Sequence, residues 1–163
     1  MSRIRTTLAV IGVLILGACS QGGMFPNSAP QGPGAGAVGD PASAAYFQSA
    51  VGDRVLFPVD QHTLTAAAQT ALAAQATWLT TNAGFSAIVE GHADEQGTRD
   101  YNLALGARRA TAARDYLVSR GVAPNRLRTV TFGKFRPIEI CSDEACYANN
   151  RRAVTVLQGA AGS

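Results

Sequence analysis

A segment rich in glycine, proline, alanine and serine divides this chain of 163 residues and limits where a folded core can form. It runs from Gln21 to about Ser43 and contains almost no large apolar residues. Such a composition cannot bury enough apolar surface to offset the entropy lost on ordering, so it predicts a flexible linker. We therefore expect a linker over residues 19–52, a single folded domain over 53–158 and a short flexible tail over 159–163.

The segment before the linker has the pattern of a secretory signal peptide. Arg3 and Arg5 precede an apolar run from Leu8 to Leu16, which is too short to span a bilayer. The run leads into Leu16-Gly17-Ala18-Cys19, which resembles the bacterial lipobox, in which the cysteine thiol is lipidated and the preceding peptide is removed. We expect residues 1–18 to be a lipoprotein signal peptide and Cys19 to be the lipidated residue. The alternatives are an ordinary signal peptide with an incidental cysteine, or a short buried helix.

The residue after Cys19 bears on the destination of such a lipoprotein. Ser20 is neutral, and the resemblance to lipoproteins with a neutral residue there implies sorting to the outer membrane. The folded domain would then lie in the periplasm on a lipid anchor.

The charge of the chain argues against a nucleic-acid partner. The chain has 14 basic and 11 acidic residues, and removal of the signal peptide with Arg3 and Arg5 leaves 12 basic residues against 11 acidic ones. The basic residues are scattered and do not form a stripe with aromatic residues between them. We expect no binding of nucleic acid.

Strand and helix patterns alternate through the predicted domain. Strands are expected at Arg54–Phe57, Ser86–Glu90, Leu127–Phe132 and Ala153–Leu157, and helices at Leu64–Leu79 and Asp100–Arg120. Thr63 or Thr65 is placed to cap the first helix, and Thr98 the second. The order predicts an α/β (α+β) fold, a two-layer sandwich with two main helices on one face of a small mixed four-stranded sheet.

The longest polar motif lies between the second strand and the second helix. It reads Gly91-His92-Ala93-Asp94-Glu95-Gln96-Gly97-Thr98, then Tyr101-Asn102, then Leu105-Gly106-Ala107-Arg108-Arg109-Ala110. Matching residues elsewhere are Phe57, Asp60, Gly133-Lys134, Pro137 and Asn150-Arg151-Arg152. In these residues the chain closely resembles the peptidoglycan-associated lipoproteins of the OmpA-like superfamily. The resemblance covers nearly all of residues 53–157 and implies an OmpA-like domain that binds peptidoglycan non-covalently, linking outer membrane to cell wall.

The motif contains groups suited to a zwitterionic ligand. Asp94 follows a strand and lies close to a helix N-terminus, which favours an ionised carboxylate. Asn102 and Arg109 are two helical turns apart and share a helix face. The diaminopimelate of a peptidoglycan stem peptide ends in an ammonium beside a carboxylate. Asp94 fits the ammonium and Arg109 the carboxylate, and both are expected to face a pocket at the sheet edge and to contribute little to folding.

By resemblance, further residues line the same pocket: Phe57, Asp60, Asn102 and either Arg151 or Arg152. Pro58 departs from the family pattern, because many members have an acidic residue at that position. Asp94 and Arg109 also have a plainer interpretation, since an Asp after a strand is often a turn residue and an Arg on a helix is often solvated.

The sequence is less consistent with a metal site or with a hydrolase. His62 and His92 are the only histidines and belong to no set of residues at metal-ligand spacing, so we expect neither metal nor cofactor. A peptidoglycan hydrolase is the alternative function, with Glu90, Asp94 and Glu95 as candidate carboxylates. No Ser or Cys has a matched base by motif, and a binding protein that is not an enzyme is preferred.

The resemblance also implies partners. Lipoproteins of this family work with the Tol system and contact its TolB-like periplasmic propeller protein, at a surface thought to overlap the wall-binding face.

A disulfide is expected near the end of the domain. Cys141 and Cys146 are the only cysteines left once Cys19 is lipidated, the compartment is oxidising, and a four-residue loop between them lets the sulfurs meet. Two free thiols are the alternative. The bridge would fix the segment that leads into Asn150-Arg151-Arg152.

We predict that Cys19 carries the membrane anchor. Mass spectrometry of the mature N-terminus should find residues 1–18 absent and Cys19 acylated, and Cys19→Ala should release the protein from membranes, because the linker has no other apolar anchor. An intact Met1 or an unmodified Cys19 in the mature protein would contradict this.

Overall fold

The computed structural model describes residues 39–140 and 142–159. The predicted signal peptide, Cys19, Cys141 and most of the predicted linker and tail lie outside the described residues. Within the described part of the chain, no helix is both long enough and apolar enough to cross a membrane.

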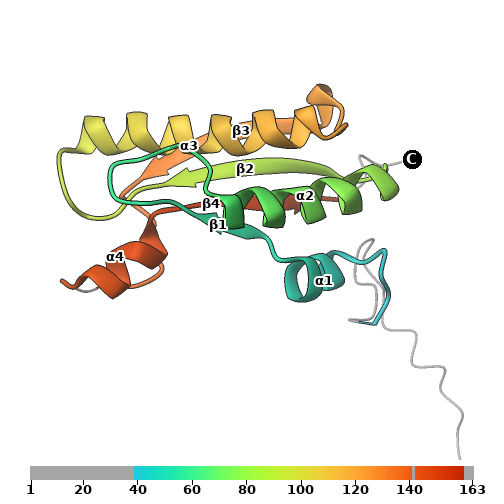
Figure 1. Cartoon of the computed structure of the whole chain (residues 1–163), viewed down its shortest axis with the longest axis horizontal. Helices are drawn as coiled ribbons and strands as arrows, with labels where there is room; N and C mark the ends of the chain where they lie inside the picture. Colours follow the sequence, from blue (N-terminus) through green and yellow to red (C-terminus); the bar gives the residue numbers. More distant parts are fainter. Residues whose placement is uncertain (1–38, 141, 160–163) are drawn as a thin grey trace, which may run out of the picture. The chain divides into compact units, whose positions relative to one another are not determined.

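A four-stranded mixed sheet forms one layer of the domain (Figure 1). Its strands are β1 (Arg54–Leu56), β2 (Ser86–His92), β3 (Leu127–Gly133) and β4 (Arg152–Gln158), in the spatial order β1-β4-β2-β3. Strand β4 runs antiparallel to both of its neighbours, whereas β2 and β3 are parallel. The parallel pair requires a crossover connection, which the second long helix provides.

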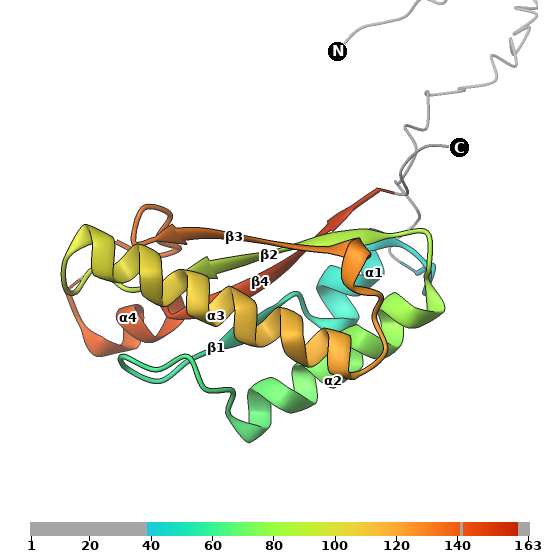
Figure 2. The ribbon, with the colours of Figure 1, turned by 90° about the horizontal axis from the view of Figure 1, so that it is seen from above.

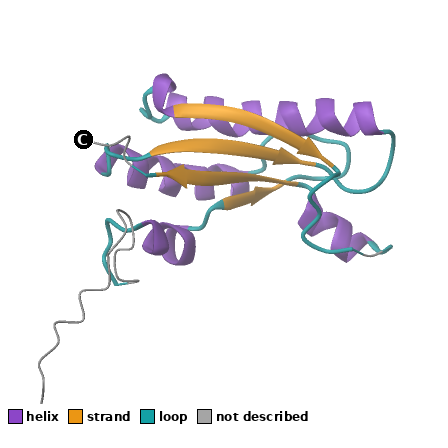
Figure 3. Cartoon of the chain, turned by 180° about the vertical axis from the view of Figure 1, so that it is seen from behind, coloured by secondary structure: helices purple, strands orange, loops and turns teal. Residues whose placement is uncertain are grey.

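Two helices cover one face of this sheet: α2 (Ala66–Thr81) and α3 (Arg99–Ser119). The view from behind in Figure 3 shows the strands in front of both helices. Thr65 and Thr98 cap them by accepting hydrogen bonds from the backbone N–H groups of Ala68 and Tyr101. The predicted two-layer architecture is therefore confirmed, with Thr65 as the first cap.

The core lies between the helices and the sheet, and it closes most tightly where α3 crosses β2. Ala110, Ala113 and Leu117 form the predicted apolar stripe of α3 and are fully buried. A Cβ atom on Gly91 would lie 1.8 Å from the carbonyl oxygen of Gly106, so glycines at this crossing allow the backbones to meet. This contact fixes the N-terminal half of α3 against the end of β2.

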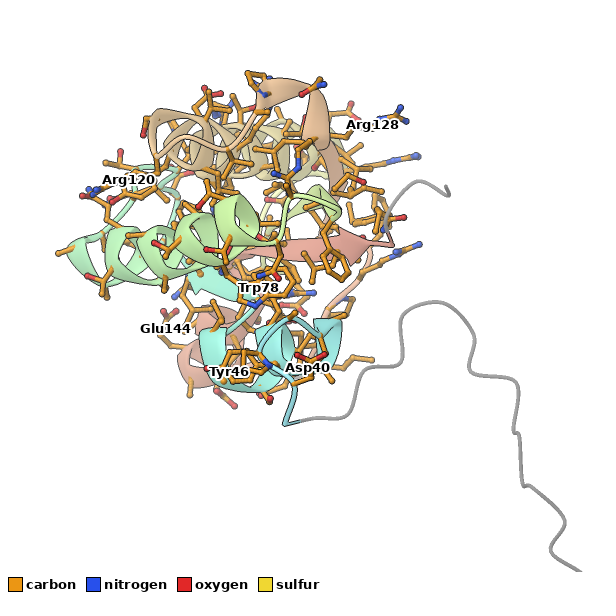
Figure 4. The ribbon with its side chains drawn as sticks, turned by 90° about the vertical axis from the view of Figure 1, so that its right-hand side faces the viewer. Asp40, Tyr46, Trp78, Arg120, Arg128 and Glu144 are labelled. Atoms are coloured by element: carbon orange, nitrogen blue, oxygen red, sulfur yellow. The ribbon has the colours of Figure 1, made fainter. Side chains whose placement is uncertain are left out.

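The folded unit begins earlier than the sequence predicts. Residues 44–46 form α1 (Ala44–Tyr46), which continues into a π-helical turn, η1 (Phe47–Val51). Phe47 is fully buried against Trp78 of α2, with ring centroids 4.9 Å apart, and the Trp78 indole N–H donates to the carbonyl of Pro41. Figure 4 shows Trp78 beside this segment. The expected linker boundary at residue 52 is therefore wrong, because Phe47 packs against Trp78, an aromatic residue far along the chain.

A second unpredicted element lies between β3 and β4. Helix α4 (Glu144–Asn150) begins at Asp143, whose carboxylate accepts the backbone N–H of Cys146 at 3.0 Å. Seven residues without an apolar period give too little sequence signal to predict a helix.

We predict that Phe47 is a core residue. Phe47→Ala should lower the free energy of unfolding by about 3 kcal/mol, because a fully buried aromatic leaves a cavity when truncated. Urea denaturation of the full-length protein measures the change. Ser49→Ala in the same segment is the matched control, since Ser49 is exposed. Equal unfolding midpoints for the two variants would mean that this segment does act as a linker.

Candidate functional site

A small cavity lies where β2 and β3 end and α3 begins. These ends of the three elements are at the left of Figure 2. The volume of the cavity is about 210 Å³. The lining residues come from the turn after β1, the loop after β2 and the first turns of α3: Val59, Asp60, Asp94, Gln96, Gly97, Tyr101, Asn102 and Leu105.

Asp94 lies in the loop directly after β2 and is only 7% exposed. One carboxylate oxygen accepts the backbone N–H of Gln96 at 3.2 Å, and the other accepts Nη1 of Arg151 at 3.1 Å. A neighbouring cation and a backbone donor both stabilise the negative charge. The predicted anion is thus held in a fixed orientation at the cavity wall.

Asp60 presents a second carboxylate from the turn after β1. Its φ of 57° lies in the left-handed region, which costs a non-glycine residue about 1 kcal/mol. Its side chain accepts a short hydrogen bond from the Tyr101 hydroxyl. Strain of this kind persists only where the surroundings hold the turn in place.

Arg109 holds that turn. Its Nε donates to the Gln61 carbonyl at 2.8 Å, Nη2 to the Pro58 carbonyl at 3.2 Å, and Nη1 to the His92 carbonyl at the end of β2 at 2.9 Å. The guanidinium also lies over the Phe57 ring, 5.3 Å from its centroid. One side chain of α3 therefore ties together the ends of two strands.

The expectation that Arg109 faces an open pocket is wrong, and its bonds to three backbone carbonyls argue against the expectation that it contributes little to folding. The side chain is fully buried, and burial lowers its pKa to about 10, although the charges of Asp94 and Asp60 oppose that shift. It remains a cation at neutral pH. Helical spacing correctly places Arg109 on the face of Asn102, but it cannot show which backbone carbonyls a turn presents to it.

Asn102 organises the loop that carries Asp94. It is almost completely buried, and its amide N–H₂ donates to the carbonyls of Asp94 at 3.3 Å and Gln96 at 2.7 Å. Lys134 supports the same loop by donating to the Gly97 carbonyl at 2.7 Å. Asn102 therefore lines the cavity and also fixes its floor.

The structure distinguishes the adjacent arginines Arg151 and Arg152. Arg151 bonds Asp94, whereas Arg152 donates to the carbonyls of Asn150 and Arg136. Burial lowers the pKa of Arg151, but its bonds to Glu144 and Asp94 outweigh that effect and raise the pKa overall. Arg151 is thus the member of the pair beside the candidate site.

The predicted site residues occupy two layers. Asp60, Asp94 and Asn102 line the cavity, whereas Phe57, Arg109 and Arg151 are buried behind it. Sequence reasoning assigned no role to Val59 or Tyr101, which line the cavity and are 53% and 44% exposed. An exposed aromatic next to Asn102 in the first turn of a helix was the available signal.

Glu90, Asp94 and Glu95, the candidate carboxylates for hydrolysis, each contact a different protein group. Glu90 lies 3.6 Å from Nε2 of His92, but burial, with help from Arg152 and Arg136, lowers the pKa of His92 to about 4. That imidazole is neutral at pH 7, so the contact is not an ion pair. Glu95 accepts the amide N–H of Asn150 at 2.8 Å. Among the described residues, no group of three or more His, Cys, Asp or Glu side chains is arranged to hold a metal ion.

The predicted disulfide is partly visible. Cys146 is buried and disulfide-bonded. Its expected partner, Cys141, lies outside the described residues, so the pairing stays a prediction.

Comparison with known proteins identifies relatives along nearly the whole chain. The model of the OmpA family matches residues 56–151. The peptidoglycan-associated lipoprotein of Mesorhizobium japonicum is 47% identical over 98% of this chain and 95% of its own length. That of Rhizobium meliloti is 49% identical over 98% of this chain and 91% of its own length.

Solved structures share the fold. The crystal structure of the peptidoglycan-associated lipoprotein from Burkholderia pseudomallei matches with a TM-score of 0.67 and 34% identity, over 73% of this chain and all of that one. The C-terminal domain of Helicobacter pylori MotB matches with a TM-score of 0.62 at 20% identity, over 67% of this chain and 86% of that one, which supports the fold alone.

We predict that Arg109 is required for stability. Arg109→Ala should lower the free energy of unfolding by about 3 kcal/mol, because three buried or partly buried carbonyls lose a charged donor. Arg108→Ala is the matched control, since Arg108 is the exposed neighbour on the same helix. Urea denaturation of both variants decides the matter, and equal losses would refute the structural role of Arg109.

Proposed function

The chain belongs to the peptidoglycan-associated lipoproteins of the OmpA family, and on that premise we propose that it binds peptidoglycan without cleaving it. Its lipid anchor at Cys19 would hold it in the outer membrane, with the folded domain in the periplasm. Such a protein ties the outer membrane to the cell wall. The names of its relatives and the chemistry of the cavity support this function.

The observation that carries the proposal is the pairing of Asp94 with Arg151 beside the cavity. An anion and a cation 3.1 Å apart are complementary to a ligand that carries both charges on neighbouring atoms. The diaminopimelate of a stem peptide ends in such a group, an ammonium and a carboxylate on one carbon. We propose that Asp94 accepts the ammonium and that the positive charges of Arg151 and Arg109 attract the carboxylate.

The remaining cavity residues suit the rest of that ligand. Diaminopimelate carries its charged end on a short aliphatic chain, and Val59, Tyr101 and Leu105 provide apolar surface along the cavity. Asp60 adds a second carboxylate that can share the ammonium. The cavity, of about 210 Å³, suits one amino-acid side chain rather than a glycan strand.

Binding is favoured over hydrolysis by the state of the carboxylates. A glycosidase needs one carboxyl group that is protonated and ready to act as an acid. Asp94 instead bonds a cation and a backbone N–H, and Glu95 bonds an amide. Each carboxylate therefore serves as a hydrogen-bond acceptor for a protein group in a fixed position.

Family membership is the support for a proposed role with the Tol system. A TolB-like periplasmic protein is the proposed partner, and the process served is maintenance of the envelope during cell division.

We predict that Asp94→Asn greatly weakens the binding of the protein to peptidoglycan. Loss of a charged acceptor for the ligand ammonium should weaken binding by roughly ten- to a hundredfold. Asp100→Asn is the matched control, because Asp100 loses the same charge nearby but is exposed outside the cavity. Co-sedimentation of the full-length protein with purified peptidoglycan measures binding, and circular dichroism verifies folding.

Two results would count against the proposed function. Equal sedimentation of folded Asp94→Asn and Asp100→Asn would mean that the ligand is bound elsewhere. Release of soluble muropeptides by the native protein would instead favour the hydrolase alternative.

A further inference from the structure

Arg151 has a second carboxylate partner in addition to Asp94. Its Nη2 makes a short hydrogen bond to Oε1 of Glu144, and its Nη1 lies 3.5 Å from Oε2 of the same residue. The two guanidinium nitrogens thus face the two oxygens of one carboxylate, as in a bidentate pair. No role is assigned to Glu144 by the sequence motifs.

The two partners of Arg151 differ sharply in exposure. The side chain of Asp94 is 9% exposed, that of Arg151 4%, and that of Glu144 63%. Water can solvate Glu144 readily if it leaves Arg151, whereas a buried Asp94 cannot leave without losing its charge compensation. Glu144 is therefore the exchangeable partner.

Local structure places Glu144 in this position. It lies in the first turn of α4, after the Asp143 cap, and that turn is anchored by the buried, disulfide-bonded Cys146. Figure 4 labels Glu144 on this helix. Arg151 follows directly after the last residue of α4, and its backbone N–H donates to the Tyr147 carbonyl. The contact is therefore made by two ends of one short element.

Arg109, by contrast, has no exchangeable partner. Its three recorded bonds end on backbone carbonyls of the turn after β1 and the end of β2. Those carbonyls can leave only if the turn unfolds. Of the two cations near Asp94, Arg151 is the one that already bonds an exposed carboxylate, which a ligand carboxylate can replace.

We propose that Glu144 is an internal competitor for the ligand, an inference that rests on the proposed function. In the free protein the Glu144 carboxylate occupies the guanidinium fork of Arg151. When the ligand ammonium binds Asp94, the adjacent ligand carboxylate replaces Glu144 as the partner of the Arg151 guanidinium. The Glu144 side chain then moves into solvent. The exchange keeps the buried charge of Arg151 compensated throughout, which lowers its cost.

The inference predicts that removal of Glu144 strengthens binding while it weakens the fold. Glu144→Ala should bind the tripeptide L-alanyl-γ-D-glutamyl-meso-diaminopimelate roughly two- to fivefold more tightly than the native protein, a gain typical of releasing one partly exposed ion pair. Glu144→Gln should gain less, because the amide oxygen still accepts from Arg151. Calorimetric titration of the purified full-length protein in detergent measures the affinities, and thermal unfolding should show a slightly lower midpoint for Glu144→Ala.

Two controls separate competition from general charge effects. Glu139→Ala removes the same charge from the neighbouring loop, where Glu139 bonds Asn149, and should leave the affinity unchanged. A second peptide is the same tripeptide in which the diaminopimelate carboxylate beside the free ammonium is amidated. This peptide lacks the carboxylate that would compete with Glu144. The gain of Glu144→Ala should therefore disappear with the amidated peptide.

The outcomes distinguish the inference from the proposed function. If the native protein does not bind the tripeptide, the proposed function fails and the inference fails with it. If the native protein binds and Glu144→Ala behaves like Glu139→Ala, binds more weakly, or gains equally with the amidated peptide, the inference alone is overturned. A crystal structure of the native complex gives a test without variants, because a bond between Arg151 and Glu144 that persists beside bound ligand refutes the exchange.

Discussion

The buried guanidinium of Arg109 is the interaction on which the site depends. It joins α3 to the turn after β1 and to the end of β2 through three backbone carbonyls. A buried cation is costly unless its donors are met, so these bonds hold the turn and the strand end in one relative position. The left-handed backbone of Asp60 and the loop of Asp94 both follow from that position. Ligand geometry and fold stability therefore depend on the same side chain.

From the buried Arg109 outward, the charged side chains alternate in sign. Arg109 is followed by Asp94, then Arg151, then Glu144, and exposure is greatest at the last of these. Each buried charge is thereby compensated by a neighbour of opposite sign, which a buried ion requires. A balanced array attracts a simple anion or cation only weakly, because either one meets a like charge next to its partner. A zwitterion of matching spacing meets no such repulsion, so charge alternation favours it.

The fold was largely predictable because its signals are local. Alternation in β2, the stripe on α3 and the cap at Thr98 each act within a few residues. The site was predictable only in outline, since a motif identifies Asp94 and Asn102 but not the partners of Arg109, which are backbone carbonyls. Phe47 was missed because its partner Trp78 lies far along the chain, and Glu144 because α4 is too short to leave a periodic pattern. At Arg109 and Phe47 the sequence conceals a contact between distant segments, whereas at Glu144 it conceals a helix too short to leave a periodic pattern.

Several hydrogen bonds hold the acceptors of the proposed site in place. Asn102 and Lys134 hold the loop of Asp94 through backbone carbonyls, and Tyr101 holds Asp60. Acceptors fixed before the ligand arrives lose little entropy on binding, so more of each charge–charge contact appears as affinity. The same fixation is unsuited to catalysis, since an acid must release a proton and a nucleophile must move toward its substrate. The proposed function, a tether that leaves the polymer intact, needs firmly positioned acceptors without proton transfer, and this arrangement of carboxylates and cations is consistent with that requirement.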